Sequence, residues 1–298
     1  MIVNADCIEH LKTVEDNHFD SVVTDPPYHL TSIAKRFTNS TEAKHGKDGS
    51  FQRLSKGFMG KEWDGGDIAF TTDLWKEVYR TIKPGAVLLA FAATRNYHRM
   101  AVAIEDSGFE IFDMINWIYG TGFPKRKNLL KPAHEPIVMA RKGVNRSLNI
   151  DDCRIELSKD DKLQEGLKRD GSKLDTTDIS ETFNFKKFDR KPGLGRYPAN
   201  IIHDGSEEEW SRYFYSAKAS KKEKAGSNHP TVKPISLMRY LVKLVTPKNG
   251  LVLDPFAGTG TTGEACILEG RDYYLIEKTK EYIPDIEKRI NKYDRLGI

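Results

Sequence analysis

The sequence predicts an α/β protein with a doubly wound, mostly parallel sheet, and three observations support this. Short apolar strands alternate with amphipathic helices along much of the chain. Residues 75–91 and 236–254 share one plan, in which a helix, a turn with proline and glycine, and a short buried strand follow one another. A glycine-rich turn at 255–263 then joins the second of these strands to another helix, as Rossmann-like folds do.

The composition agrees with this fold and excludes several classes of protein. The 298 residues are 38% hydrophobic and 30% charged, which suffices for a sizeable core in one large domain or two. The longest apolar run, 86–93, is far shorter than the ~20 residues of a membrane span. Residues 1–6 lack the pattern of a signal peptide. We therefore expect a cytoplasmic protein.

Cysteine and histidine patterns argue against disulfides and metal. The three cysteines are scattered and include no C-x-x-C pair, and the eight histidines include no H-E-x-x-H motif. We therefore expect that the protein uses no metal cofactor.

The predicted elements follow the hydrophobic pattern from the first residues onward. Residues 6–14 predict a short helix, and residues 20–25 predict a β-branched strand that Pro26 and Pro27 end. Later helices are predicted at 73–82, 98–106, 234–245, 262–269 and 281–289. Later strands are predicted at 86–91, 110–117, 251–254 and 273–277, with Lys83-Pro84-Gly85 as the turn before the first of them.

Two segments lack such periodicity. Residues 29–66 hold many Gly, Ser, Lys and Asn residues, so we expect a long mobile loop. Residues 151–191 carry 21 charged positions among 41, which predicts a flexible insertion or a module that reads the substrate. We therefore divide the chain into 1–150, a charged insertion at 151–194, and 195–298.

Positive charge is clustered, although the net charge is only +4. The local excess is +5 over residues 35–61, +6 over 124–146 and +4 over 212–224. Solvated loops can have this composition, but three clusters on an otherwise acidic chain favour a partner with a phosphate backbone. The candidate DNA-binding residues are Lys35, Arg36, Lys44, Lys47, Arg53, Lys56, Lys125, Arg126, Lys127, Lys221 and Lys222.

The glycine-rich turn is the first motif with a chemical meaning. It follows the strand that ends at Asp254, contains Gly258, Gly260 and Gly263, and precedes a strand that ends in Glu277. Glycines allow a backbone to approach a ligand, a helix N-terminus offers N–H groups to an anion, and the acid accepts from ribose hydroxyls. A nicotinamide dinucleotide and S-adenosylmethionine both suit this pattern, and a structural turn is the plain alternative.

The position of the turn separates the two cofactors. Only 44 residues follow Asp254, enough for two helices and one strand. A dinucleotide fold begins with this unit and needs several more strands after it. The order of motifs therefore argues against an oxidoreductase.

The second motif is Asp25-Pro26-Pro27-Tyr28, directly after a predicted strand. The exocyclic amino group of adenine or cytosine is a poor nucleophile because its lone pair is delocalised into the ring. The Asp25 carboxylate and a rigid Pro26 carbonyl would accept its two N–H bonds and direct the lone pair at a methyl donor. Tyr28 offers a face on which an extruded base stacks. Neither a metal nor a covalent nucleophile is needed.

With these motifs the sequence resembles the amino-methylating DNA methyltransferases that act on adenine N6 or cytosine N4. It resembles their permuted arrangement, in which the catalytic tetrapeptide precedes the cofactor motif. Asp6-Cys7 before a helix, His229-Pro-Thr-Val-Lys233-Pro234 and Asp254-Pro-Phe-Ala-Gly-Thr-Gly-Thr-Thr262 also resemble family motifs. The resemblance covers roughly 1–145 and 195–298. It implies a seven-stranded, circularly permuted methyltransferase sheet with an inserted recognition region.

The resemblance also implies roles for individual residues. It assigns Asp25, Pro26, Pro27 and Tyr28 to the target base. It places Asp6 and Cys7 beside the adenine of S-adenosyl-L-methionine, Glu277 on its ribose and Lys233 near its carboxylate. The remaining residues implied at the cofactor, chiefly its methionine end, are Asp254, Phe256, Ala257, Gly258, Thr259, Gly260 and Thr261. Double-stranded DNA is the implied partner, and a homodimer and a cognate restriction endonuclease stay open.

Alternatives remain at this point. An RNA or protein-glutamine methyltransferase would use N-P-P-Y more often than D-P-P-Y, whereas a non-catalytic DNA-binding module would not need both motifs intact. By resemblance D-P-P-Y favours adenine, without excluding cytosine. Single residues suit packing or surface positions better than catalysis, namely His29, His98, His134, His203 and Trp117, whereas Trp63 in the predicted loop suits either packing or base stacking.

Overall fold

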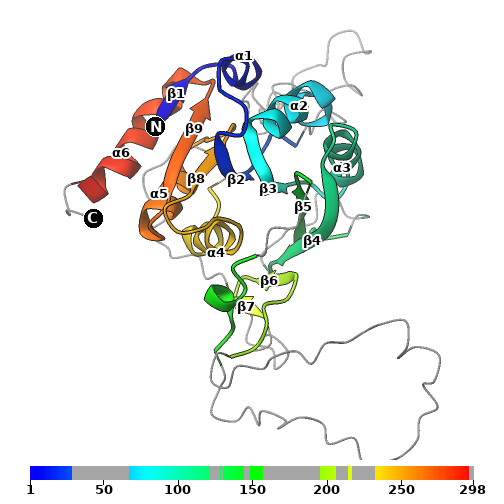
Figure 1. Cartoon of the computed structure of the whole chain (residues 1–298). Coiled ribbons are helices and arrows are strands. Elements are labelled where there is room, and N and C mark those ends of the chain that lie inside the picture. The colour runs from blue at the N-terminus through cyan, green and yellow to red at the C-terminus, as the bar shows by residue number, and fades with distance from the viewer. Residues whose placement is uncertain are drawn as a thin grey trace, which may run out of the picture.

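The computed structural model describes residues 1–28, 67–120, 128, 130–143, 148–156, 195–205, 214–216 and 232–294. Within them one sheet of nine strands has the order β1-β9-β8-β2-β3-β5-β4-β6-β7 (Figure 1). The strands are β1 (Ile2–Asn4), β2 (Phe19–Thr24), β3 (Ile82–Phe91), β4 (Glu110–Ile118), β5 (His134–Arg141), β6 (Ile201–His203), β7 (Tyr215–Ser216), β8 (Leu251–Asp254) and β9 (Asp272–Glu277).

The sheet is mostly parallel, as the sequence predicts. Only β5 runs antiparallel, to β3 on one side and β4 on the other, and every other neighbouring pair is parallel. The first seven strands in the order match the predicted count of seven. Two short strands, β6 and β7, extend the sheet beyond β4, so the count of seven is too low for the described residues.

Helices cover both faces of the sheet in the described part of the chain (Figure 1). One face carries the first three helices, whose core includes Leu11, Trp75 and Ile104. The other face carries the last three, whose cores include Leu241 and Ile286. The helices are α1 (Cys7–Leu11), α2 (Thr72–Thr81), α3 (Tyr97–Glu105), α4 (Ile235–Val245), α5 (Thr261–Leu268) and α6 (Ile283–Asp294), with short 3-10 turns at Ile68–Phe70, Asp151–Cys153 and Lys280–Tyr282.

The central strands are buried on both faces, which explains their continuous apolar sequences. In β3, Ala86 to Phe91 alternate between the two cores, with Leu88 on one and Leu89 on the other. At about 25 cal/mol per Å² of apolar surface, this burial is the main stabilisation of the fold.

One predicted turn lies inside a strand. Lys83, Pro84 and Gly85 belong to β3, where the pairing with β2 shifts register between Phe19 and Ser21. Gly85 has a φ of 78°, a conformation that favours glycine. The turn chemistry therefore produces an irregularity within the strand instead of ending it.

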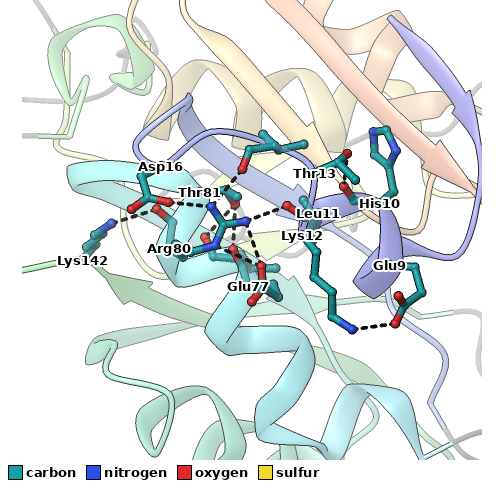
Figure 2. A network of polar contacts seen from close by, with 12 residues as sticks. Glu9, His10, Leu11, Lys12, Thr13, Asp16, Glu77, Arg80, Thr81 and Lys142 are labelled. Carbon is teal, nitrogen blue, oxygen red and sulfur yellow. Dashed lines mark hydrogen bonds and ion pairs between the residues drawn. The ribbon is translucent and has the colours of Figure 1, made fainter.

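A network around Arg80 fixes the connection between α1 and β2 at the edge where β2 begins (Figure 2). The guanidinium donates to the carbonyl oxygens of Leu11 and Val14, at 2.7 and 2.8 Å, and to carboxylate oxygens of Asp16 and Glu77, at 2.5 and 2.8 Å. This network lies at the opposite end of β2 from Asp25.

Within the described ranges, no helix combines the length and the apolar character that a membrane span requires.

Candidate active site

The candidate site lies where two neighbouring parallel strands end. Strands β2 and β8 pair through Ser21–Val252 and Val22–Leu253, so both motifs emerge at the same edge of the sheet. There the Thr24 hydroxyl donates to the Asp254 carboxylate at 2.7 Å. This bond joins residues 230 positions apart. Carboxyl ends of parallel strands are the usual ligand-binding edge of such sheets.

The tetrapeptide is part of a compact charged cluster. Lys233 Nζ lies 2.7 Å from Asp25 Oδ2 and 3.1 Å from Glu135 Oε2. The Tyr28 hydroxyl lies 2.7 Å from Asp25 Oδ1 and 2.9 Å from Glu135 Oε2, so its one proton can be donated to either carboxylate. Two acids thus share two donors. We call Asp25, Tyr28, Glu135 and Lys233 the carboxylate cluster.

Burial and charge tune the donors of this cluster. Burial alone would lower the pKa of Lys233, but the carboxylates of Asp25 and Glu135 outweigh it and raise that pKa. Burial raises the pKa of Tyr28 well above its ordinary value, and the two carboxylates raise it further. At neutral pH the lysine is therefore a cation, and the phenol keeps its proton.

The backbone of the tetrapeptide is held from a different element. Asn96, directly before α3, donates from its side-chain amide to the carbonyl oxygen of Tyr28 at 2.6 Å. Pro26 and Pro27 have fixed φ angles, and every described peptide bond is trans. The carbonyl groups next to Asp25 are therefore rigidly oriented.

The glycine turn has the geometry that close backbone approach needs. Gly258 and Gly260 have φ angles of 54° and 77°, and residues that carry a Cβ rarely adopt such positive values. The buried Glu277 carboxylate accepts from the backbone N–H of Gly258 at 2.9 Å and of Thr279 at 2.7 Å. A carboxylate has further lone pairs, so Glu277 keeps acceptor capacity for a ribose hydroxyl. These residues fit an adenosine cofactor.

Asp254 is more deeply buried, and both its oxygens are already bonded within the protein. Its Oδ1 accepts from Thr24 and from the Phe256 N–H, and its Oδ2 accepts from the Thr262 hydroxyl at 2.5 Å. Burial raises its pKa to about 6, although these hydrogen bonds act in the opposite direction. The carboxylate therefore shapes the turn between β8 and α5.

Helix α6 supports the turn from behind. Arg289 donates to the carbonyl oxygen of Thr259 at 2.9 Å and to the buried carboxylate of Glu264 at 2.5 Å. A Cβ on Gly260 would lie 2.8 Å from Ile286 Cγ2, so that glycine lies against α6.

Some predicted residues have structural partners of their own. Asp6 caps α1, accepting from the N–H groups of Ile8 and Glu9, and also binds Lys278. Cys7 is buried, which raises its pKa to about 12, so it is not a reactive thiolate. The predicted place of Lys233 near the cofactor carboxylate stays a prediction, because its ammonium group contacts Asp25 and Glu135.

Other predictions lie outside the described residues. These are the whole loop 29–66, most of the insertion, the motif residues 229–231, His29 and Trp63, and all eleven candidate DNA-binding residues, Lys35, Arg36, Lys44, Lys47, Arg53, Lys56, Lys125, Arg126, Lys127, Lys221 and Lys222. Among the described single residues, His98 and His134 are exposed, His203 is buried, and Trp117 packs beside Tyr119 at 5.2 Å between ring centroids.

Two contributors to the site are absent from the sequence-based prediction. Glu135 comes from β5, and Asn96 precedes α3. Recognising Glu135 requires knowing that β5 lies beside β3, and the apolar run at 137–140 is the signal that indicates such a buried strand.

A doubly wound sheet with a glycine turn and an Asp-Pro-Pro-Tyr tetrapeptide at one edge defines a methyltransferase that uses S-adenosylmethionine. A family model described as DNA methylase matches residues 19–288. The chain therefore belongs to the DNA methylase family, whose members methylate exocyclic amino groups, at N6 of adenine or N4 of cytosine. It is an enzyme of this class, and its cofactor is S-adenosyl-L-methionine.

Individual relatives agree with this assignment. The chain is 26% identical over 297 residues to the type II methyltransferase M.HinfI of Haemophilus influenzae, covering 98% of this chain and 68% of that protein. It is 23% identical to M2.LlaDCHI of Lactococcus lactis subsp. cremoris, covering 100% and 91%. Among solved structures, the M1.HpyAVI–SAM complex shares the fold, with a TM-score of 0.54, 20% identity and 98% of both chains covered.

The family assignment decides between the earlier alternatives. The predicted fold class, cofactor and reaction are confirmed, and the oxidoreductase and the non-catalytic module are set aside. A cytosine-N4-specific methyltransferase, PvuII, also shares the fold, with a TM-score of 0.57 and 16% identity over 99% of this chain and 91% of that one. The fold is thus compatible with either target base.

Proposed function

We propose that this enzyme methylates N6 of an adenine that is flipped out of double-stranded DNA, at a specific sequence. The observation that carries the proposal is the position of Asp25. Its carboxylate follows β2 directly, on the strand that neighbours the cofactor strand β8. The D-P-P-Y form of the tetrapeptide supports adenine over cytosine.

Asp25 and Pro26 prepare the nucleophile. The Asp25 carboxylate and the Pro26 carbonyl each accept one N–H of the target amino group, which localises the nitrogen lone pair. Their rigidity keeps the donor and acceptor atoms in a reactive arrangement. The Tyr28 ring offers a stacking face for the extruded base. Asp25 is also placed to take the proton that the nitrogen releases after transfer.

The glycine turn and its neighbours hold the cofactor. Bound S-adenosylmethionine supplies a methyl group on a sulfonium. Glu277 accepts from the ribose, and Gly258 and Gly260 let the backbone of the turn approach the methionine end, while their own N–H groups stay bonded to Glu277 and to the carbonyl oxygen of Ala257. Asp6 and Cys7 line the adenine side. Asp254, with both oxygens bonded internally, acts by fixing the turn.

The proposal extends to organisation and partners. Residues 1–150 and 195–298 form the catalytic and cofactor parts, and the charged insertion at 151–194 carries target recognition. The matched relatives are type II methyltransferases, which supports a cognate restriction endonuclease and a cytoplasmic site of action. A homodimer stays a prediction, and light scattering of the purified protein would test it by measuring the oligomeric state.

Incubation with DNA and labelled S-adenosylmethionine, followed by nucleoside analysis, tests the proposal. We expect N6-methyladenine in double-stranded DNA and no label in RNA. N4-methylcytosine as the sole product would overturn the adenine assignment.

The role of Asp25 is tested in the same assay. Asp25→Ala should abolish methyl transfer while calorimetry shows nearly unchanged cofactor binding, because the variant loses the acceptor for the base, whereas Glu135 still holds Lys233 and Tyr28 and the glycine turn is unchanged. Near-normal turnover by this variant would contradict the role.

A further inference from the structure

The carboxylate cluster contains one more acid than the proposed reaction needs. Glu135 is half-buried beside Lys233 and Tyr28, and its side chain is 21% exposed. It comes from the middle of the sheet, on the antiparallel strand β5. Its Oε2 atom lies 2.9 Å from the Tyr28 hydroxyl and 3.1 Å from Lys233 Nζ.

The two oxygens of Asp25 are both engaged by the donors that also contact Glu135. Tyr28 donates to Oδ1 and Lys233 to Oδ2, each at 2.7 Å. A target amino group that binds Asp25 competes with one of these donors. Leaving a buried ammonium or phenol group without a hydrogen-bond acceptor costs free energy. Glu135 already lies within reach of both, so neither donor loses its partner.

The net charge of the carboxylate cluster also depends on Glu135. With both acids ionised and Lys233 protonated, the cluster carries one net negative charge, whereas Asp25 and Lys233 alone would carry none. During transfer the amino nitrogen uses its lone pair to form the new C–N bond, while the bond between the methyl group and the cofactor sulfur breaks and its electron pair stays on that sulfur as a thioether. The nitrogen is positive until one of its protons passes to Asp25. A net negative cluster stabilises this charge in a partly dry site.

We propose that Glu135 is a positioning residue for methyl transfer, which retains Tyr28 and Lys233 when the target amino group binds Asp25 and leaves the cluster with its negative charge. This inference rests on the proposed role of Asp25. It assigns no contact with the base or the cofactor to Glu135.

Two variants of Glu135 and one control test the inference. Glu135→Gln keeps the shape and removes the charge, and Glu135→Asp keeps the charge on a shorter side chain. Glu110→Gln removes a carboxylate from the same pair of strands, where Glu110 forms an exposed ion pair with Arg141 at 2.6 Å. The measurements are the single-turnover rate at saturating DNA and cofactor, the two binding affinities, and the melting temperature.

We expect Glu135→Gln to lower the single-turnover rate by ~100-fold, the scale seen when a reacting group is misplaced. Cofactor and DNA affinities should stay near the wild-type values, so the loss falls on kcat. Glu135→Asp should recover part of the rate, and Glu110→Gln should match the wild type.

A wild-type rate for Glu135→Gln would overturn the inference. So would a loss of rate that follows an equal loss of cofactor affinity and melting temperature in both Glu135 variants, since that indicates a purely structural residue. The Asp25→Ala experiment separates the two proposals. If Asp25→Ala is inactive and Glu135→Gln is fully active, only the inference about Glu135 fails.

Discussion

At the scale of single residues, Gly260 carries two constraints at once. Its φ of 77° excludes most side chains, and its missing Cβ makes room for Ile286 on α6. The sequence motif predicts the first constraint, since glycine turns near cofactors need such angles. The second depends on how α6 folds back on the turn and is not contained in the local pattern.

Gly270 offers a matched comparison for this glycine. It has a φ of 66° but nothing within 4 Å of an added Cβ. Gly270→Ala should lower the free energy of unfolding by about 1 kcal/mol through backbone strain alone. Gly260→Ala should lower it further and weaken cofactor binding by ~10-fold or more, which is about 1.4 kcal/mol. Calorimetry and urea denaturation of both variants check this. Equal cofactor affinity in the two would contradict it.

Asp254 predicts a pH dependence of stability. Its pKa is raised from 3.8 to about 6 by burial, so the folded state holds the proton more tightly than the unfolded state. The stability that this group contributes is complete below pH 3.8 and is lost as the pH rises through about 6. The difference corresponds to about 3 kcal/mol.

Asp254→Asn removes this titration and keeps the shape. The free energy of unfolding of the variant, relative to the wild type, should therefore rise between pH 4 and pH 7, by up to about 3 kcal/mol. Urea denaturation across this range measures it. A relative stability that does not change with pH would show that Asp254 does not titrate there.

At the scale of elements, α5 and α6 are joined by one buried acid. Glu264 on α5 accepts from Arg289, Lys292 and Tyr293, all on α6. Burial alone would raise the pKa of Glu264, but these hydrogen bonds outweigh it and lower that pKa. The ionised acid thus stabilises the contact between the two helices.

Glu264→Gln should lower the free energy of unfolding by about 3 kcal/mol at neutral pH, because it leaves two cations without their buried partner. Glu9→Gln is the control, since Glu9 pairs with Lys12 at an exposed position and its loss should leave the urea midpoint unchanged. A Glu264→Gln variant as stable as the control would contradict the prediction.

Because the pKa of Glu264 is lowered in the folded state, the stability that its ionised form contributes to the wild type should disappear only as the pH falls below 4.5.

Elements differ in how far the sequence predicts them. The strand that leads to Asp25 and the one that ends at Asp254 follow from short apolar runs that proline or glycine ends. Strand β5 does not, because its buried run Ile137–Ala140 is short, follows Pro136 and lies within a basic segment. The strands β1, β6 and β7 are two or three residues long and exist through pairing with distant segments. The sequence does not indicate the role of Glu135 for the same reason that it does not predict strand β5.

At the scale of the whole molecule, DNA binding is expected to depend on the positive cluster at 35–61, which lies outside the described residues. Replacing Lys44, Lys47, Arg53 and Lys56 by glutamine should weaken binding to all DNA sequences. Each lost phosphate contact should reduce the slope of log affinity against log salt by ~0.9. Recognition should barely change, because phosphate contacts position a protein without reading bases.

A second quadruple variant removes the same charge elsewhere. Lys12, Lys76, Lys248 and Lys288 are exposed on the described part of the protein. Their replacement by glutamine should change the salt slope much less. Fluorescence anisotropy with target and non-target duplexes at several salt concentrations measures both variants. An altered preferred site in the first variant, with an unchanged salt slope, would make the cluster a reader of bases.

The bond between Thr24 and Asp254 has a consequence for how such enzymes are arranged. The strands that present the base-binding and cofactor-binding motifs are direct neighbours, so their lateral separation is the ordinary spacing of a sheet, about 4.8 Å. The distance between the methyl donor and the target base is therefore set by the spacing of the strands and not by the separation of the two motifs along the chain. Which motif the ribosome makes first has no effect on that distance. The same chemistry is therefore compatible with either order of the two halves.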